Sequence, residues 1–358
     1  MAGGHSATAG MSAAIRMPAD FEPQSAIVVG CNELLPNSPQ LLLDLLGVLL
    51  GYVPVIAIVN DEAQRMQLLT LLCDWGLSAC LPCFISLPVI GTWVRDYGPG
   101  FVYREDGDLL ILDAQYFWQD RPDDDRMPTE LAGLLRVPVR HVPWRVEGGN
   151  ILSNGQGLCI TTHALLHRNG VPLSEAGRIA DMLHEYYGFE QCVFLRGLLS
   201  EHTGHVDMFA TFLAPDLIAV GQYDPAVDPV NSDVLDENAA VLAATMTRSG
   251  PLRVVRIPMP SNRGSIWRTY TNVLFAGRRL IVPVYPPCDP ERQAQAIKIF
   301  RTYLPDHEII EINANEMIQR RGALRCATIA IPRLDRLAWL GQDQTPTLPS
   351  RILHRLSA

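Results

Sequence analysis

The segment Glu201–Phe209, EHTGHVDMF, is the starting point for interpreting this chain of 358 residues. The residues that follow it are apolar through Leu213, which predicts a strand that begins inside the segment. Side chains two positions apart share one face of a strand, so His205 and Asp207 are expected to project together while Val206 points into the core. An imidazole beside a carboxylate can move protons while the carboxylate holds a cationic substrate. An isolated pair of this kind is more often a solvated strand end, so its meaning depends on the rest of the chain.

Composition predicts a compact soluble protein and argues against a nucleic-acid partner. Apolar residues make up 48% of the sequence and charged residues 19%, which is enough apolar material for a large core. The formal net charge of −9 is unfavourable for binding phosphate backbones, which requires clustered Lys and Arg. The acidic balance is compatible with a small cationic substrate. The length allows one large domain or two ordinary ones.

The cysteines and the N-terminal segment favour a cytoplasmic protein. The eight cysteines are dispersed, and the lone CxxC at Cys80–Cys83 lacks a second ligand pair for zinc, so we expect neither a metal site nor a disulfide framework. Residues 1–17 are small and polar without a continuous apolar segment, which predicts a disordered leader and not a signal peptide. The apolar run Leu41–Leu50 is short and contains Asp44, so it predicts a buried helix and no membrane span.

Strand and helix patterns alternate along the chain. The apolar run Ser25–Gly30 predicts a strand, and Asp61 predicts the N-cap of a following helix. The turn Glu105–Asp108 predicts a hairpin between two short strands. No linker of low complexity interrupts the alternation. We therefore predict a single α/β domain over residues 18–335, followed by a C-terminal tail over residues 336–358.

A second polar cluster, TWVRDYGP at Thr92–Pro99, suits the recognition of a planar cation. The Gly-Pro pair at its end predicts a turn that holds Asp96 at the edge of a loop beside Trp93. A carboxylate next to a flat aromatic ring matches a delocalised cation such as a guanidinium. The alternative is a plain turn in which Asp96 only pairs with its neighbour Arg95.

A third cluster, VEGGN at Val146–Asn150, combines a carboxylate with two glycines. The glycines permit close approach of the backbone or a positive φ. Glu147 is a candidate to orient His205 or to bind substrate, whereas a plain Gly-Gly turn is the commoner explanation of such a string. The cluster is no phosphate loop, because the trailing Gly-Lys-Ser/Thr is missing.

The fourth cluster, GALRCAT at Gly322–Thr328, contains a cysteine near the end of the chain. A single cysteine is usually a small buried apolar residue. A histidine partner elsewhere in the chain makes Cys326 a candidate nucleophile that reacts as the thiolate.

Together and in this order, the four clusters resemble the signature of the agmatine deiminase and bacterial-type peptidylarginine deiminase family. The resemblance runs from about Met17 to Pro332, and the segments Arg268–Asn272 and Ile281–Tyr285 resemble a further motif of that family. The resemblance implies a pentein fold, which is an α/β propeller of five ββαβ-type units around a central active site. It also implies a hydrolase that uses neither a metal nor a cofactor. It leaves the oligomeric state open, with a homo-oligomer as one option.

The resemblance implies a role for each matching residue. Cys326 would be the nucleophile and His205 the general acid and base. Asp96 and Asp207 would clamp the guanidinium, and Glu147 would orient His205 or the substrate. Attack of the thiolate on the guanidinium carbon and departure of ammonia would leave a thiouronium intermediate, which water hydrolyses to a urea-type product. The predicted substrate-binding residues are Asp96, Asp207, Trp93, Trp118, Arg121, Asn150 and Asn272.

Two departures from the family pattern bear on the substrate. Arg325 stands where the family usually has a histidine before the cysteine, which would alter the thiol pKa or the preference for substrate charge. Bacterial-type peptidylarginine deiminases bind an α-carboxylate with an arginine-rich string, but this chain reads YFWQDRPDDD at Tyr116–Asp125 and keeps only Arg121. Trp118 and Asp120 favour an amine or neutral tail there. The predicted substrate is therefore agmatine or a similar small guanidine.

Several alternatives stay open. With the same fold, the substrate could be free arginine, peptidylarginine or a methylated arginine, or the amidino group could pass to an amine. A catalytically silent pentein that binds a ligand or partner is a different class, with which Arg325 is compatible. The joint presence of Cys326, His205 and the carboxylates argues against it, because a binding protein does not need the thiol. A zinc hydrolase is the last alternative.

Overall fold

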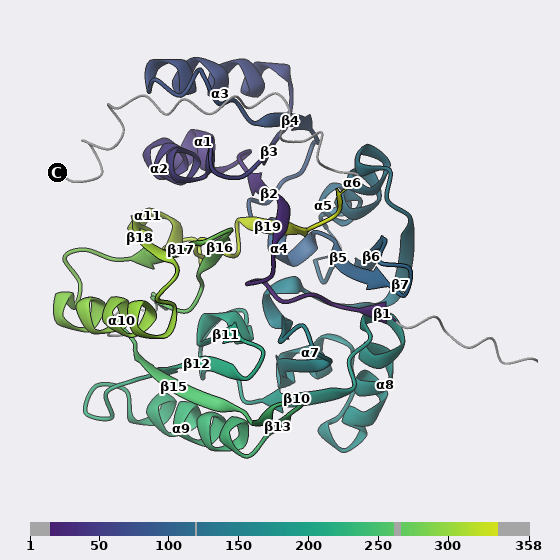
Figure 1. Cartoon of the computed structure of the whole chain (residues 1–358), viewed down its shortest axis with the longest axis vertical. Coiled ribbons are helices and arrows are strands. Elements are labelled where there is room, and N and C mark those ends of the chain that lie inside the picture. Colours follow the sequence, from purple (N-terminus) through teal and green to yellow (C-terminus); the bar gives the residue numbers. More distant parts are fainter. Residues whose placement is uncertain (1–14, 119, 261–265, 336–358) are drawn as a thin grey trace, which may run out of the picture.

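The computed structural model describes residues 15–118, 120–260 and 266–335. These residues form five sheets of three or four strands and one short two-stranded sheet of β13 (Met246–Thr247) and β14 (Gly250–Pro251). Within the described part of the chain, no sheet closes on itself. The longer helices lie along the outside of the molecule in Figure 1, whereas β2 and the one-turn helix α4 lie near its middle.

One strand order recurs along the chain. Two antiparallel strands are followed by a helix and then by a third strand that runs parallel to the second. Short polar turns allow the antiparallel pairs, whereas the parallel return needs the helical crossover. The order is found in β5 (Gly100–Arg104), β6 (Leu109–Gln115), α6 (Met127–Leu135) and β7 (Val139–Arg145); in β8 (Leu152–Ser153), β9 (Leu158–Thr162), α8 (Ala176–Tyr187) and β10 (Gln191–Leu195); in β11 (Ala210–Ala214), β12 (Leu217–Gln222), α9 (Pro229–Ala243) and β15 (Arg253–Pro258); and in β16 (Leu274–Ala276), β17 (Arg279–Val284), α10 (Pro290–Tyr303) and β18 (Glu308–Asn313).

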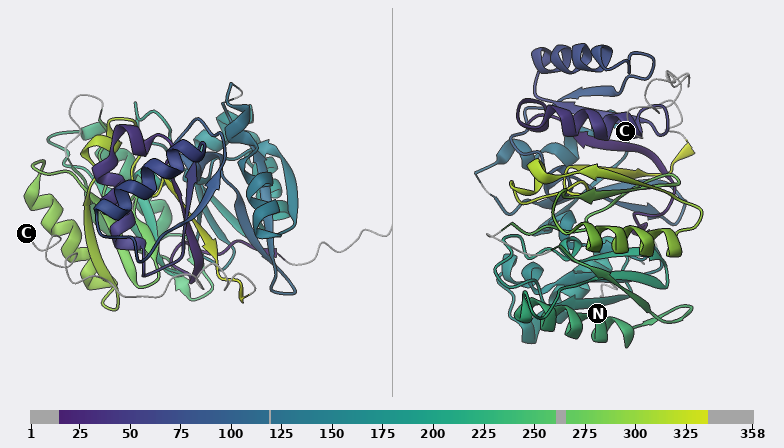
Figure 2. Two further views of the ribbon diagram at one scale, coloured as in Figure 1. Left: turned by 90° about the horizontal axis from the view of Figure 1, so that it is seen from above. Right: turned by 90° about the vertical axis from the view of Figure 1, so that its left-hand side faces the viewer.

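The remaining sheet joins the two ends of the described chain. Its strand order is β19-β2-β3-β4, and β19 (Thr328–Pro332) pairs antiparallel with β2 (Gln24–Gly30). Parallel strands β3 (Val55–Val59) and β4 (Cys83–Ser86) follow, with α2 (Pro39–Leu49) and α3 (Glu62–Asp74) as the crossovers. Figure 2 shows the yellow C-terminal strand beside the purple N-terminal segment. Because Cys326 lies two residues before β19, the pairing of β19 with β2 places the cysteine next to this sheet.

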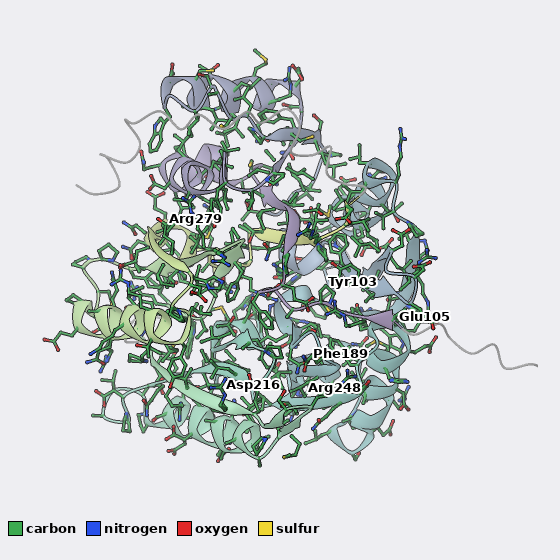
Figure 3. All side chains as sticks on the ribbon, viewed as in Figure 1. Tyr103, Glu105, Phe189, Asp216, Arg248 and Arg279 are labelled. Atoms are coloured by element: carbon green, nitrogen blue, oxygen red, sulfur yellow. The ribbon has the colours of Figure 1, made fainter. Side chains whose placement is uncertain are left out.

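Burial of apolar side chains holds each sheet to its helices. All five residues of β3 are buried, as expected for a strand covered on both faces, and seven residues of α2 are buried against the same core. Side chains also join the sheet of β17 to helix α2 and the loop after it. Arg279 of β17, labelled in Figure 3, donates to the carbonyl of Val48 at 2.6 Å and to Glu308 at 2.8 Å, and it lies over the ring of Tyr52.

Several sequence predictions about the fold are confirmed. The strand Ser25–Gly30 is β2, and the turn Glu105–Asp108 joins β5 to β6. Asp61 caps α3 as predicted, because its carboxylate accepts a hydrogen bond from the backbone N–H of Gln64 at 2.8 Å. The buried helix predicted at Leu41–Leu50 is α2. None of the helices in the described ranges is long and apolar enough to cross a bilayer.

The prediction that His205 and Asp207 begin a strand is wrong. Val206–Met208 form the 3₁₀ turn η3, and β11 begins only at Ala210. Hydrogen bonds from Met208 N to His205 O and from Phe209 N to Val206 O close this turn. Alternate side chains of a tight turn do not share a face, so His205 and Asp207 have different partners.

The predicted start of the folded domain at residue 18 is also wrong, because the described structure already contains a strand before it. Ile15 and Arg16 form β1 (Ile15–Arg16), which pairs antiparallel with β5. These two residues had been included in the predicted leader, residues 1–17. The rest of that leader up to residue 14 and the predicted tail, residues 336–358, lie outside the described residues.

Candidate active site

One cavity of about 350 Å³ gathers predicted site residues from distant segments. Its walls come from α4 (Val94–Tyr97), the loop before α5 (Pro122–Asp125), the η1 (Gly148–Asn150) and η3 loops, and the segment that precedes β19. Seven of the ten predicted site residues line it, namely Trp93, Asp96, Trp118, Arg121, Glu147, His205 and Cys326.

Asp96 is held at the cavity by α4 and by a close approach of the η1 backbone. The N–H of Gly149 donates to Asp96 Oδ1 at 3.0 Å. A Cβ at residue 149 would lie 2.5 Å from His205 Nδ1 and 2.6 Å from Asp96 Oδ1, so only glycine fits there. The close approach is one of the two conformations that the Gly-Gly string permits, and the plain-turn explanation of that string does not account for it. Arg95 pairs with Asp20 at 3.4 Å and not with Asp96, so the plain-turn alternative is wrong.

His205 lies between two carboxylates. Its Nε2 is 3.2 Å from Glu147 Oε2, and its Nδ1 is 3.5 Å from Asp96 Oδ1. Burial lowers the pKa of His205, but the charge of Asp96 and the hydrogen bond and charge of Glu147 outweigh it and raise the pKa to about 9. Burial, together with the charge of Glu147, raises the pKa of Asp96 to about 6 against the opposing effect of His205. At neutral pH the site therefore holds an imidazolium between two carboxylates.

Glu147 is fixed by a second cation. Arg168 is the last residue of helix α7 (His163–Arg168). Its Nε donates to the same Oε2 atom of Glu147 that faces His205. Its Nη2 donates to Thr203 O at 3.2 Å, and its guanidinium lies 4.1 Å from the ring centroid of Phe117. Burial raises the pKa of Glu147, but the hydrogen bond to His205 and the charges of His205 and Arg168 reverse this and lower it. Glu147 is thus held as a carboxylate.

Cys326 is a buried thiol in contact with Asn272. The Nδ2 of Asn272 lies 3.2 Å from Cys326 Sγ, and its Oδ1 accepts from the N–H of Arg325 at 2.9 Å. Burial, followed by the charges of Asp207 and Asp96, raises the pKa of the thiol well above its usual value. A cation placed against these carboxylates would reverse part of that shift and favour the thiolate.

Asp207 does not line the cavity, although it was expected to hold a guanidinium there together with Asp96. It is fully buried, and its Oδ2 accepts from Nη1 of Arg325 at 2.9 Å. Its Oδ1 has no hydrogen-bond partner among the described residues. Burial raises the pKa of Asp207, against the lowering effect of Arg325 and His205.

Asn150 and Asn272 also lie outside the cavity lining. The Oδ1 of Asn150 accepts from the N–H of Val206 at 3.1 Å and from Thr162 Oγ1 at 3.0 Å. Asn150 therefore ties the loop of His205 to β9 and is a support of the site. Asn272 likewise supports the segment of Cys326, through its contacts with Cys326 Sγ and the N–H of Arg325.

The cavity also contains residues that the sequence analysis missed. The largest group is cationic and consists of Arg168, Arg320 and Arg321, with His202 and Thr203 beside them. Arg321 has a φ of +72°, which is uncommon for a residue with a side chain, and its Nη1 is 2.8 Å from His202 Nε2. The sequence signal for these residues was the pair Arg320-Arg321 shortly before Cys326, because two adjacent arginines are not expected in a buried strand.

Solved structures of guanidine-modifying enzymes share this fold. The agmatine deiminase of Enterococcus faecalis matches with a TM-score of 0.78 and 23% identity over 89% of this chain and 96% of its own. The C. jejuni agmatine deiminase matches with a TM-score of 0.75 and 20% identity over 92% of this chain and 99% of its own. A Legionella pneumophila relative that carries the agmatine deiminase name provisionally is 27% identical over 71% of this chain and 76% of its own length.

A family model also matches most of the chain. The model of the Porphyromonas-type peptidyl-arginine deiminases matches residues 16–332, which span all four sequence clusters and every wall of the cavity. This chain belongs to the Porphyromonas-type peptidyl-arginine deiminase family.

Proposed function

We propose that the chain is a cysteine-dependent deiminase that hydrolyses a small guanidine and releases ammonia. The observation that carries the proposal is the meeting of Cys326, His205, Asp96 and Glu147 in one cavity, although they come from four distant parts of the sequence. A thiol, a charged imidazole and carboxylates in a buried site are the groups that nucleophilic substitution at a guanidinium carbon requires.

The proposed reaction begins when the substrate guanidinium binds against Asp96. Its positive charge offsets the carboxylates that hold the thiol neutral, so the thiol releases its proton to solvent water and Cys326 Sγ bonds to the guanidinium carbon. The His205 imidazolium then donates its proton to a terminal nitrogen, and the carbon–nitrogen bond breaks to release ammonia.

The second half of the proposed reaction regenerates the enzyme. The covalent product of the first half is a thiouronium on Cys326. Neutral His205 takes a proton from water, and the resulting hydroxide bonds to the same carbon. The carbon–sulfur bond then breaks while the hydroxyl proton passes to the sulfur, which releases a neutral urea-type product and restores the Cys326 thiol. Glu147, held by Arg168, keeps the imidazole oriented through both halves.

Agmatine is the substrate that the relatives indicate first, since the E. faecalis and C. jejuni enzymes carry its name and one C. jejuni structure holds its substrate. The exposed Trp118 at the edge of the cavity agrees with a neutral or amine tail. A second candidate is a guanidine with a carboxylate tail, such as arginine, which the arginines at residues 168, 320 and 321 favour.

The remaining features of the proposal follow from the resemblance. The five sheets would be the five units of a pentein propeller, which the repeated strand order and the outer position of the helices support. Residues 15–335 would be the catalytic domain, in the cytoplasm, as a possible homo-oligomer. The prediction that no metal or cofactor is needed stays a prediction.

Ammonia release tests the proposal. The panel contains agmatine, free arginine, a peptide with C-terminal arginine and methylarginine, with Cys326→Ala as the matched control. Turnover of agmatine alone, lost in the variant, supports the first candidate, whereas turnover of arginine or the peptide supports the second. Silence across the panel from folded protein would contradict the proposed function.

A further inference from the structure

Arg325, the residue directly before the proposed nucleophile, is a buried guanidinium with a partner for each of its nitrogens. Only 4% of its side chain is exposed. Two of its hydrogen bonds go to carboxylates and two to backbone carbonyls, namely Nε to Asp20 Oδ2 at 2.8 Å, Nη1 to Asp207 Oδ2 at 2.9 Å, Nη1 to Gly148 O at 3.3 Å and Nη2 to Ile151 O at 3.2 Å.

These partners belong to the segments that build the site. Gly148 and Ile151 flank the loop that follows Glu147, and Asp207 lies two residues after His205. Arg325 therefore links the cysteine segment to the loops of the proposed base and its orienting carboxylate. A histidine at this position has only two ring nitrogens and could not reach all four acceptors.

The contact with Arg325 leaves one oxygen of Asp207 without a donor. Oδ1 is buried and has no hydrogen-bond partner in the described part of the chain. A buried carboxylate oxygen without a donor costs free energy, which a donor supplied by a ligand would recover. Asp207 is close enough to the reacting groups for its charge to raise the pKa of both Cys326 and His205, after burial has raised the first and lowered the second.

We propose that Arg325 is a positioning residue that holds Asp207 by one oxygen, so that the other accepts a hydrogen bond from the substrate guanidinium. The internal guanidinium of Arg325 and that of the substrate would then share one carboxylate. The inference rests on the proposed function, because it assumes a substrate guanidinium beside Cys326.

The charges around Asp207 make the idea testable through pH. The groups that influence Asp207 are the cations Arg325, His205 and Arg95, while Asp96 and Cys326 lie in the same site. Burial already raises the pKa of Asp207, and Arg325 is the largest opposing influence. Removing the Arg325 charge should raise that pKa further and protonate the carboxyl at a higher pH.

The test compares Arg325→Gln and Arg325→Lys with Asp20→Asn, using the guanidine that the wild type turns over best. Arg325→Gln should raise KM about 100-fold and move the acid limb of kcat/KM up by about one pH unit, because the acceptor is both misplaced and protonated. Arg325→Lys keeps the charge without the planar fork, so KM should rise only about 10-fold and the acid limb should stay in place.

Asp20→Asn is the matched control, because Asp20 binds the other end of Arg325 and does not line the cavity. It should lower the midpoint of thermal unfolding and leave KM within about twofold. Wild-type KM and an unmoved acid limb in both Arg325 variants, with lower thermal stability, would overturn the proposal and make Arg325 purely structural. If Arg325→Gln does not fold, the KM of Arg325→Lys decides.

A binding measurement separates this inference from the proposed function. Calorimetric titration of agmatine and of arginine into Cys326→Ala and Cys326→Ala/Arg325→Lys requires no turnover. About tenfold weaker binding in the double variant supports the proposal even if the wild type releases no ammonia. Equal affinity in the two proteins, or no binding to either, would overturn it.

Discussion

Asp96 and Asp207 were expected to share one task, but the protein surrounds them differently. Asp96 lines the cavity, accepts from the backbone N–H of Gly149 and faces His205, and its pKa is raised to about 6. Asp207 lies behind the cavity wall, and a buried arginine binds one of its oxygens.

The difference shows that residue type and motif do not determine how a carboxylate acts. Asp96 has no cationic side chain within bonding distance other than His205, so it is available to a ligand and titrates near neutrality. Asp207 is committed to Arg325, which in turn binds Asp20 and two backbone carbonyls. Asp96 therefore faces the cavity, whereas Asp207 gives one oxygen to Arg325 and, in the proposal above, only the other to the substrate.

The largest expected effect is that of Asp96→Asn on catalysis. The amide oxygen can still accept from Gly149, so the fold should be retained, but the charge proposed to hold the guanidinium is lost. We expect kcat/KM to fall about 1000-fold, with the free energy of unfolding changed by less than about 1 kcal/mol. Steady-state kinetics and urea unfolding of the same preparation measure both. Comparable losses of stability and activity would contradict the assignment.

Asp207→Asn should lower the stability of the fold as well as the affinity for substrate. It leaves the buried guanidinium of Arg325 without one of its two carboxylates, so the free energy of unfolding should fall by about 3 kcal/mol. Urea unfolding measures this loss, with Asp96→Asn as the control. A stability equal to that of the wild type would show that the Arg325–Asp207 contact contributes little to the fold.

The pH dependence of kcat/KM should separate the two carboxylates further. Asp96 must be ionised and has a raised pKa, so activity should fall about tenfold per unit below about pH 6. His205 must be protonated and also has a raised pKa, so activity should fall in the same way above about pH 9. In Asp96→Asn the acid limb near pH 6 should disappear. An unchanged acid limb in that variant would assign it to another group.

The smallest effect is expected from the two buried asparagines. Asn272→Ala removes the donor to Cys326 Sγ and should lower kcat about tenfold. Asn150→Ala frees the N–H of Val206 and should lower the free energy of unfolding by about 1 to 2 kcal/mol, with a smaller effect on kcat. Kinetics and unfolding of both variants give the comparison. Equal effects on kcat would remove the distinction between them.

Much of the site was predictable from sequence because its residues lie in short, distinctive strings. The Gly-Gly pair after Glu147 permitted a close backbone approach or a positive φ, and the structure shows Gly149 against both Asp96 and His205. The four strings also identified the family, which the family model over residues 16–332 confirms.

The rest depended on contacts between distant residues. Arg325 and Asp207 are 118 positions apart, and no local pattern around His205 indicates that Asp207 turns away to meet an arginine. The alternation of polar and apolar residues there predicted a strand, whereas Gly204 at a φ of +67° and the turn at Val206–Met208 direct the two side chains apart. Arg168 was missed for the same reason, because its partner Glu147 is 21 positions away.

The covalent intermediate on Cys326 is the most direct test of the account. Protein quenched in acid during turnover of its best guanidine substrate would be analysed by intact and peptide mass spectrometry. We predict an adduct on the peptide that contains Cys326, with the mass of the substrate minus ammonia, and neither adduct nor turnover in Cys326→Ala. Undiminished ammonia release by Cys326→Ala would contradict the central claim.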